Sequence, residues 1–324
     1  METYENIYFL LQTSLAAVKA VDESENIIKV ALGSMLEILK QTPFVELTVS
    51  DILWGYENSL IQLAKGIFPE DKAYPFEKFG LFAGKNDTYP GILTTMTGQS
   101  SVEDVGRVVS WNGETKLDFW KDECNQIKGT DGSSFPPGIL PNTTLYLFNR
   151  DLCRSLPLVY EADTVSQGVP GYRFVPPKDI FSPPEENPDN ACYCMNEAGC
   201  KVPRGVFNMS ACSFGSPVMI SWPHFFQADP KLLEDVVGLK PEQSKHQLFM
   251  DIQPKLGIPL VAQARSQINI QMYKMDEVKP AEGLRDMIFP FMWFSSGIES
   301  IEDEDTLALL HTAVHAPEKA RSAL

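Results

Sequence analysis

The sequence predicts an α+β fold in which helices come first and β-strands follow. Residues 22–41 carry apolar side chains at the spacing of one helical face, whereas residues 267–275 alternate between apolar and polar side chains. Short β-rich runs separated by glycine and proline begin beyond residue 77. A chain of 324 residues, 44% of them hydrophobic, is long enough to bury a real core.

The first sixty-odd residues are predicted to be mainly helical. The helix over residues 22–41 ends at Pro43, because proline cannot continue a helix. A second helix follows over residues 51–65, and Thr48 or Ser50 can cap its first turn. Apolar residues also fill the segment before these helices, but polar residues interrupt that run.

The remainder is predicted to be mostly strand, with one further helix. In residues 267–275, Ile268, Ile270 and Met272 alternate with polar neighbours, which indicates a strand with one wet face. The proline-rich segment 175–190 is predicted to be a long loop. A final helix is expected over 302–315, and the other β-rich runs are 145–148, 172–175 and 218–222.

Charge and hydropathy exclude several classes of protein. A net charge of −16 opposes binding to nucleic acid, whose phosphates require a basic surface. No run of apolar residues is long enough to span a bilayer. Residues 7–21 lack the basic start and the clean apolar centre of a secretory signal.

The six cysteines leave three interpretations open, namely disulfides, free buried thiols or a metal site. Their spacing matches neither a paired zinc motif nor a redox C-x-x-C, and the four histidines do not flank them. An even number of cysteines favours three disulfides, although fifteen connectivities are possible. The cysteines are Cys124, Cys153, Cys192, Cys194, Cys200 and Cys212.

Three N-x-S/T sequons agree with an oxidising, secretory compartment. They begin at Asn86, Asn142 and Asn208. Such short motifs also arise by chance, so they gain weight only alongside the even cysteine count.

Two groupings of residue types resemble catalytic sites, and neither is convincing. His311 and His315 have the spacing of a metalloprotease helix, but Thr312 follows His311 where the glutamate base would be required. Ser221, His224 and Asp251 supply the residue types of a triad without a nucleophile elbow. The sequence therefore predicts no enzyme activity, no metal and no cofactor.

A series of longer motifs resembles the class B scavenger receptor family, which includes a fatty-acid translocase, a high-density-lipoprotein receptor and a lysosomal integral membrane protein. The likeness covers roughly residues 14–310, with the motifs in order. They are L-W-G-Y (53–56), W-N-G-E-T-K-L-D-F-W (111–120), C-N-Q-I-K-G-T-D-G-S-S-F-P-P (124–137), C-R-S-L (153–156), G-V-P-G-Y-R-F (168–174), E-N-P-D-N-A-C-Y-C (186–194), P-H-F-F-Q-A-D-P (223–230) and M-D-I-Q-P-K-L-G-I-P (250–259).

The resemblance implies a fold and a cysteine pairing. The family fold is a twisted antiparallel β-barrel with a lipid tunnel, capped by a helical bundle. The cysteine pairs would be Cys124 with Cys192, Cys153 with Cys212, and Cys194 with Cys200. The chain is expected to form a single ectodomain over 1–324, with a helical apex at about 14–66, a barrel core at about 77–300 and the helix over 302–315.

Several family members bind ligands at the apex through a basic cluster. Lys29, Lys40 and Ile27 lie in the corresponding segment here, whereas Glu37 and Glu46 deplete its positive charge. The alternative interpretation is an amphipathic helix whose charged side chains are simply solvated.

The resemblance implies a receptor that binds lipid or lipoprotein and passes lipid towards a membrane without catalysis. The alternative is a sorting receptor that binds a protein partner at its apex. Family members carry a membrane helix at each end, so the membrane helices and the opening strands are expected to be missing from this chain. The implied location is the extracellular or luminal side of the plasma membrane or an endolysosomal membrane.

Overall fold

The computed structural model of the chain divides into two compact units. Unit 1 comprises Met1–Pro90, Asn208–Ile220 and Ile268–Met292, and unit 2 comprises Gly91–Phe207, Ser221–Gln267 and Trp293–Leu324. The residues that the structure describes are 7–10, 34, 37–38, 44–59, 78, 80, 82–84, 91–195, 200–213, 215–274 and 283–322.

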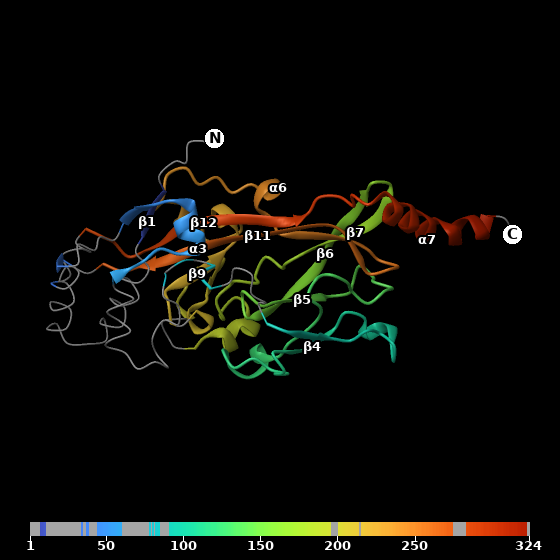
Figure 1. The fold of residues 1–324 in the computed structure, drawn as a ribbon, viewed down its shortest axis with the longest axis horizontal. Helices are drawn as coiled ribbons and strands as arrows, with labels where there is room; N and C mark the ends of the chain where they lie inside the picture. The colour runs from blue at the N-terminus through green and yellow to red at the C-terminus, as the bar shows by residue number, and fades with distance from the viewer. Residues whose placement is uncertain are drawn as a thin grey trace. The chain divides into compact units, whose positions relative to one another are not determined.

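The largest sheet in the described part of the chain has eight strands. They are β5 (Leu145–Asn149), β6 (Arg154–Ser166), β7 (Val169–Val175), β8 (Val206–Asn208), β9 (Val218–Ser221), β10 (Phe249–Gln253), β11 (Ile258–Met272) and β12 (Met287–Ile298). The strand order is β5-β6-β7-β10-β11-β9-β8, and β12 also pairs with β11. β6 and β7 run side by side as an antiparallel pair (Figure 1).

This order describes an open sheet, so the closed barrel that the resemblance implies is not found among the described strands. The mixed α+β class is confirmed. Two further pairs of strands are antiparallel and separate from the large sheet. They are β1 (Ile7–Leu10) with β2 (Phe44–Leu47), and β3 (Leu93–Thr95) with β4 (Val108–Trp111).

The core of unit 2 lies against β6, β7, β10 and β11. Leu156 and Leu158 on β6 are fully buried, and Phe174 on β7 is fully buried as well. Burial of such side chains is the main favourable contribution to folding, about 1.5–3 kcal/mol for each.

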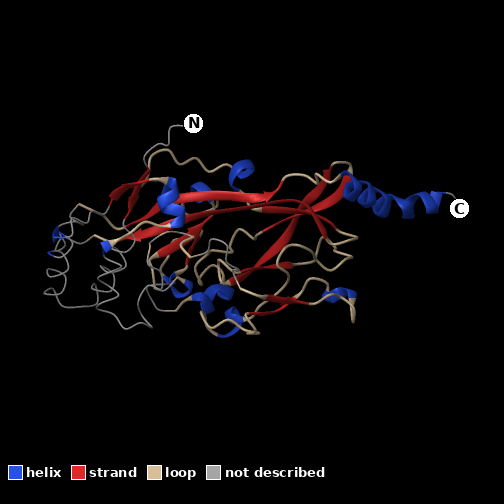
Figure 2. Cartoon of the chain, in the orientation of Figure 1, coloured by secondary structure: helices blue, strands red, loops and turns tan. Residues whose placement is uncertain are grey.

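Long loops separate β4 from β5, and Figure 2 shows them in tan.

The strand predicted over 267–275 is confirmed as far as Met272, where β11 ends, but the prediction of a wet face is wrong. Ile270 and Met272 pack in unit 1 against Phe289 and Phe291, while Asn269 is fully buried as well. The Asn269 side-chain amide donates to the Met219 carbonyl at 3.3 Å. A buried amide that forms a hydrogen bond can occupy a position that the sequence pattern assigns to solvent.

The helix predicted over 51–65 is confirmed only at its start, as α3 (Val49–Trp54). The predicted continuation is wrong at residues 55–58, which are not helical because the helix ends at Gly55 with φ 108°, and residues 60–65 lie outside the described part. Thr48 is its cap, because the Thr48 hydroxyl accepts from the Asp51 amide while the Asp51 carboxylate accepts from the Thr48 amide, both at 3.1 Å. This reciprocal pair is a capping box.

The prediction that the first sixty-odd residues are mainly helical is wrong at β1 and β2. β2 starts directly after Pro43, and its partner lies far away in the sequence. Most of the helix predicted over 22–41 lies outside the described residues, although Ser34, Glu37 and Ile38 are helical.

The predicted final helix is confirmed as α7 (Glu304–Ser322), which continues past the expected end at residue 315. Asp303 caps it by accepting from the Thr306 amide at 2.8 Å. Leu310 and Val314 pack against Val169 and Leu260 within unit 2. None of the helices that the structure describes is long and apolar enough to cross a bilayer.

The remaining helices are short and lie in connecting segments. They are α6 (Gln243–His246) and the 3-10 helices η1 (Val102–Asp104), η2 (Asp122–Asn125), η3 (Pro188–Tyr193), η4 (Ser210–Cys212), η5 (Pro223–Phe225) and η6 (Pro230–Leu233).

The turn between β10 and β11 depends on Gly257. Its φ is +71°, and an added Cβ would overlap the Phe135 carbonyl oxygen. We expect Gly257→Ala to lower the free energy of unfolding by about 3 kcal/mol or more, from backbone strain plus overlap. Gly138, with φ +83° and open space around it, provides the control. Gly138→Ala should lower it by about 1–2 kcal/mol, from strain alone.

Denaturant unfolding of both variants measures the difference. Equal losses in Gly257→Ala and Gly138→Ala would contradict the close approach of the turn to Phe135.

Candidate functional site

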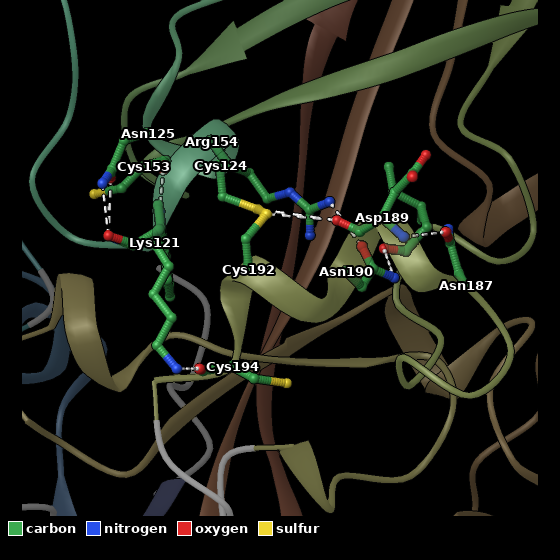
Figure 3. Close-up of a disulfide and its surroundings, with 12 residues drawn as sticks. Lys121, Cys124, Asn125, Cys153, Arg154, Asn187, Asp189, Asn190, Cys192 and Cys194 are labelled. Carbon is green, nitrogen blue, oxygen red and sulfur yellow. Dashed lines mark hydrogen bonds between the residues drawn. A yellow bond between two sulfur atoms is a disulfide. The ribbon is translucent and has the colours of Figure 1, made fainter.

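The cysteine-rich segment is joined to η2 by a disulfide between Cys124 and Cys192. Cys124 lies in η2 and Cys192 in η3, and their Cα atoms are 5.7 Å apart (Figure 3). The Lys121 amide donates to the Cys192 carbonyl at 3.1 Å, and the Lys121 ammonium donates to the Cys194 carbonyl at 2.6 Å. Lys121 thus holds the backbone on both sides of Tyr193 close to η2, next to the disulfide.

A second disulfide joins Cys194 to Cys200, six positions further along the chain. Cys153 and Cys212 are disulfide-bonded too, and none of the six cysteines is a free thiol. The two pairs Cys124–Cys192 and Cys194–Cys200 are those that the family resemblance implies. Within the described residues, no group of three or more histidine, cysteine or carboxylate side chains could hold a metal ion.

The proline-rich segment before η3 is a loop, as predicted, and Asn190 holds it in place. The buried Asn190 amide donates to the Ser182 carbonyl at 2.8 Å and to the Ile180 carbonyl at 3.2 Å. These bonds satisfy backbone acceptors that a loop would otherwise bury without partners. Asn190 therefore fixes the loop that carries Cys192.

Arg154, at the start of β6, is the most unusual charged residue near this disulfide. Its side chain extends past the Cys124–Cys192 bond towards Asn190 (Figure 3), and only 3% of the residue is exposed. The guanidinium carbon lies 4.0 Å from the centre of the Tyr193 ring and 4.6 Å from that of Phe207. Aromatic faces attract such a cation.

Burial lowers the pKa of the Arg154 guanidinium, and the nearby Tyr193 opposes that change. Two of its nitrogens, Nε and Nη1, are buried without a hydrogen-bond partner, while Nη2 is 3.5 Å from the Asn190 side-chain oxygen. The faces of the aromatic rings and the Asn190 side-chain oxygen thus surround this buried charge.

A cavity of about 650 Å³ lies beside the same disulfide in unit 2. Its lining combines cations and carboxylates with the disulfide and with apolar side chains, so it is a cleft of mixed polarity. The lining includes Lys121, Lys128, Arg154, Asp122, Asp179 and Asp189.

A second cavity, of about 840 Å³, lies over β7, β10 and β11 in unit 2. The Arg173 guanidinium at its wall binds the buried Asp251 carboxylate through two hydrogen bonds of 2.7 and 2.8 Å. The Asp251 bond raises the pKa of Arg173, and the guanidinium also lies 4.0 Å from the centre of the Phe249 ring. Arg265, on β11, lines the same cavity.

The residue types of a triad do not form one. The Asp251 carboxylate is bound by Arg173, and the Ser221 hydroxyl donates to the Trp222 carbonyl at 3.0 Å. His224 instead stacks on His246, with ring centres 4.4 Å apart. The three side chains thus serve different local contacts.

Some of the predicted glycosylation and apex residues lie within the part of the chain that the structure describes, and others do not. Asn142 is exposed in a turn, whereas Asn208 is partly buried and its side-chain oxygen accepts from the Ser210 amide at 2.9 Å. Asn86 lies outside the described residues, and so do the apex residues Ile27, Lys29 and Lys40.

Sequence reasoning missed Arg154, the Arg173–Asp251 pair and the His224–His246 stack. Each lies within or next to a quoted motif, but no local pattern tells a buried, partnered charge from a solvated one. The partners are distant in sequence, so only the folded chain brings them together.

Comparison with known proteins gives the family. The profile of the CD36 family matches residues 3–324. Lysosome membrane protein 2 of Homo sapiens is 37% identical over 285 residues, covering 88% of this chain and 58% of that protein. Scavenger receptor class B member 1 of Rattus norvegicus is 34% identical over 294 residues, covering 90% of this chain and 56% of that protein.

The chain belongs to the CD36 family, the family of the class B scavenger receptors, which confirms the resemblance read from its motifs. Lysosome membrane protein 2 of Mus musculus is also similar, at 34% identity over 312 residues. The chain spans less than two thirds of the length of each of these three relatives.

Proposed function

We propose that this chain is part of a receptor ectodomain that binds lipid or lipoprotein and passes lipid towards a membrane without catalysis. The observation that carries the proposal is the family match, which runs over nearly the whole chain. One set of relatives is named as scavenger receptors, and another as lysosome membrane proteins. We accordingly place the chain on the extracellular or luminal side of a membrane.

The disulfides support this location. An oxidising compartment allows disulfides to form and persist, whereas the cytosol keeps thiols reduced. The pairing of Cys153 with Cys212 belongs to the same proposal, as does attachment of glycans at Asn86, Asn142 and Asn208. Exposure of Asn142 in a turn suits a glycan there.

The lipid path proposed for the family fold is an apolar tunnel within a barrel. Charged side chains line both cavities of unit 2 alongside apolar ones, so we do not assign the tunnel to either of them. Ile270 and Met272 in unit 1 are buried against Phe289 and Phe291, so this cluster is packed core and not an open lining. The proposed tunnel would shield a poorly soluble ligand from water.

The apex residues Ile27, Lys29 and Lys40 are proposed to meet the ligand first. The alternative function, a sorting receptor for a protein partner, would use the same segment. The two functions predict different cargo on the purified chain.

Lipid extraction followed by mass spectrometry separates them. The chain is produced through a secretory pathway, purified under mild conditions and compared with an unrelated secreted protein purified in the same way. We expect lipid in near-stoichiometric amount on this chain and not on the comparison protein. A lipid-free chain that retains a tightly bound protein would contradict the lipid proposal and favour the sorting receptor.

A further inference from the structure

Two histidines in unit 2 form a stacked pair that the proposed function does not use. The His224 ring follows Pro223 in η5, and the His246 ring ends α6. Their ring centres are 4.4 Å apart and the planes differ by 11°. The edges of both rings meet the Trp293 side chain on β12, at 6.1 Å from His224 and 5.7 Å from His246 between ring centres.

Each imidazole accepts a hydrogen bond from a backbone amide. The Lys240 amide donates to Nδ1 of His224 at 3.0 Å, and the Glu242 amide donates to Nδ1 of His246 at 2.8 Å. A nitrogen that accepts carries no proton, so both rings are neutral with the proton on Nε2. Protonation of Nδ1 would leave each backbone amide without its acceptor and facing another donor.

The backbone around His224 is held in a demanding conformation. His224 has φ 55° and Phe225 has φ 54°, in the left-handed region that residues other than glycine rarely adopt. The His224 amide donates to the buried Gln267 side chain at 2.8 Å, which ties this conformation to β11. Such strain persists only while the surrounding contacts hold it.

Some of the charges around the two histidines lower the pKa of the imidazoles, and one raises it. Burial lowers the pKa of both imidazoles below the ordinary value of 6.5, and each is also lowered by the Lys245 ammonium. Arg265 on β11 and the neighbouring His224 lower the pKa of His246 further, whereas the Glu242 carboxylate raises both. Two stacked cations would repel each other, so the pair favours the neutral state.

The segment 240–247, whose Lys240 and Glu242 amides donate to the two histidines, also borders the 840 Å³ cavity. Glu242, Gln243, Ser244 and Gln247 all line that cavity, together with Arg265. The Arg265 guanidinium donates to the Ser244 and Gln247 carbonyls, both at 3.0 Å, and so ties α6 to β11. Movement of residues 240–247 would therefore reshape the rim of the cavity.

We propose that His224 and His246 form an acid-sensitive latch that fastens residues 240–247 over the rim of this cavity. At neutral pH the two Nδ1 acceptors hold the Lys240 and Glu242 amides. In acid, protonation removes both acceptors and sets two cations against each other, so the segment loosens and the rim opens. The latch goes beyond lipid binding and does not depend on it.

The direction of the pH effect follows from the lowered pKa. A base with a lowered pKa in the folded chain binds fewer protons folded than unfolded, so its stabilising contribution is present above about pH 6.5. The contribution is lost as the pH falls below that value through the lowered pKa. The latch therefore holds at neutral pH and releases in acid.

Two measurements on the full chain test the latch. Long-range ¹H–¹⁵N NMR of the imidazoles reports which nitrogen carries the proton and where each ring titrates. Hydrogen exchange of the Lys240 and Glu242 amides, corrected for the intrinsic pH effect, reports whether the segment is held. We expect protection of these amides to fall at least about tenfold between about pH 7 and about pH 5.

The controls distinguish the latch from general acid destabilisation. His224→Gln/His246→Gln should show protection that no longer depends on acid, while His311→Gln, which removes an imidazole on α7, should behave like the unsubstituted chain. An acid-dependent loss that persists in the double variant would overturn the proposal. Rings in the unsubstituted chain that titrate at 6.5, with protons on Nδ1, would overturn it too, even if the double variant failed to fold.

Discussion

Replacing Cys124 and Cys192 together with alanine should lower the free energy of unfolding by about 4 kcal/mol, on the chain-entropy model of disulfide stabilisation. The bond closes a loop of 68 residue steps, and opening it lets the unfolded chain sample many more conformations. Urea unfolding of the oxidised proteins measures the loss. The double substitution leaves no unpaired thiol to exchange with the other disulfides.

The matched control is Cys194→Ala/Cys200→Ala. That bond closes a loop of only six steps, so the same account predicts a loss of about 2 kcal/mol. The larger loss should fall on the longer loop. Equal losses in the two double variants, or no loss from the first, would show that the Cys124–Cys192 bond does not restrain the unfolded chain in this way.

We expect substitution of Arg173 with methionine to lower the free energy of unfolding by about 3 kcal/mol, because it leaves a buried carboxylate without its cation. The Asp251 side chain is 4% exposed and is bound by Arg173 through both oxygens. Without Arg173, the Asp251 carboxylate would keep the side-chain hydrogen bond from the Thr164 hydroxyl, at 3.2 Å. Thermal or denaturant unfolding measures the effect.

The double variant Arg173→Met/Asp251→Leu separates the value of the ion pair from the penalty of breaking it. Removing both charges eliminates the unpaired carboxylate, so we expect the double variant to be more stable than Arg173→Met alone. A double variant as unstable as the sum of its two single variants would mean that the charges act independently. That outcome would contradict the pairing across β7 and β10.

Local sequence pattern was sufficient for several elements. The runs at 145–148, 172–175 and 218–222 became β5, β7 and β9, since β-branched and aromatic residues between turn signals suit a half-buried strand. The start of β11 was missed, because its first half contains Pro259 and polar residues that pairing with β10 accommodates. β1 and β2 were missed because their pairing is non-local.

The candidate site was predictable only through the family resemblance. Spacing alone left the cysteines open to disulfides, thiols or metal, and the motifs supplied the pairing. The burial of Arg154 among aromatic rings and the stacking of two histidines depend on distant segments, so no single stretch of sequence indicates them. The burial of Asn269 was equally unpredictable from the local pattern. Its alternating position predicts exposure to solvent, whereas its hydrogen bond to the Met219 carbonyl permits burial.

We propose lipid binding for this disulfide-framed chain of the CD36 family. Isothermal titration calorimetry of the delipidated, oxidised full chain with a long-chain fatty acid tests this proposal. We expect saturable binding that is lost when the disulfides are reduced. Absence of saturable binding by the oxidised chain, under conditions where a known fatty-acid carrier binds, would contradict it.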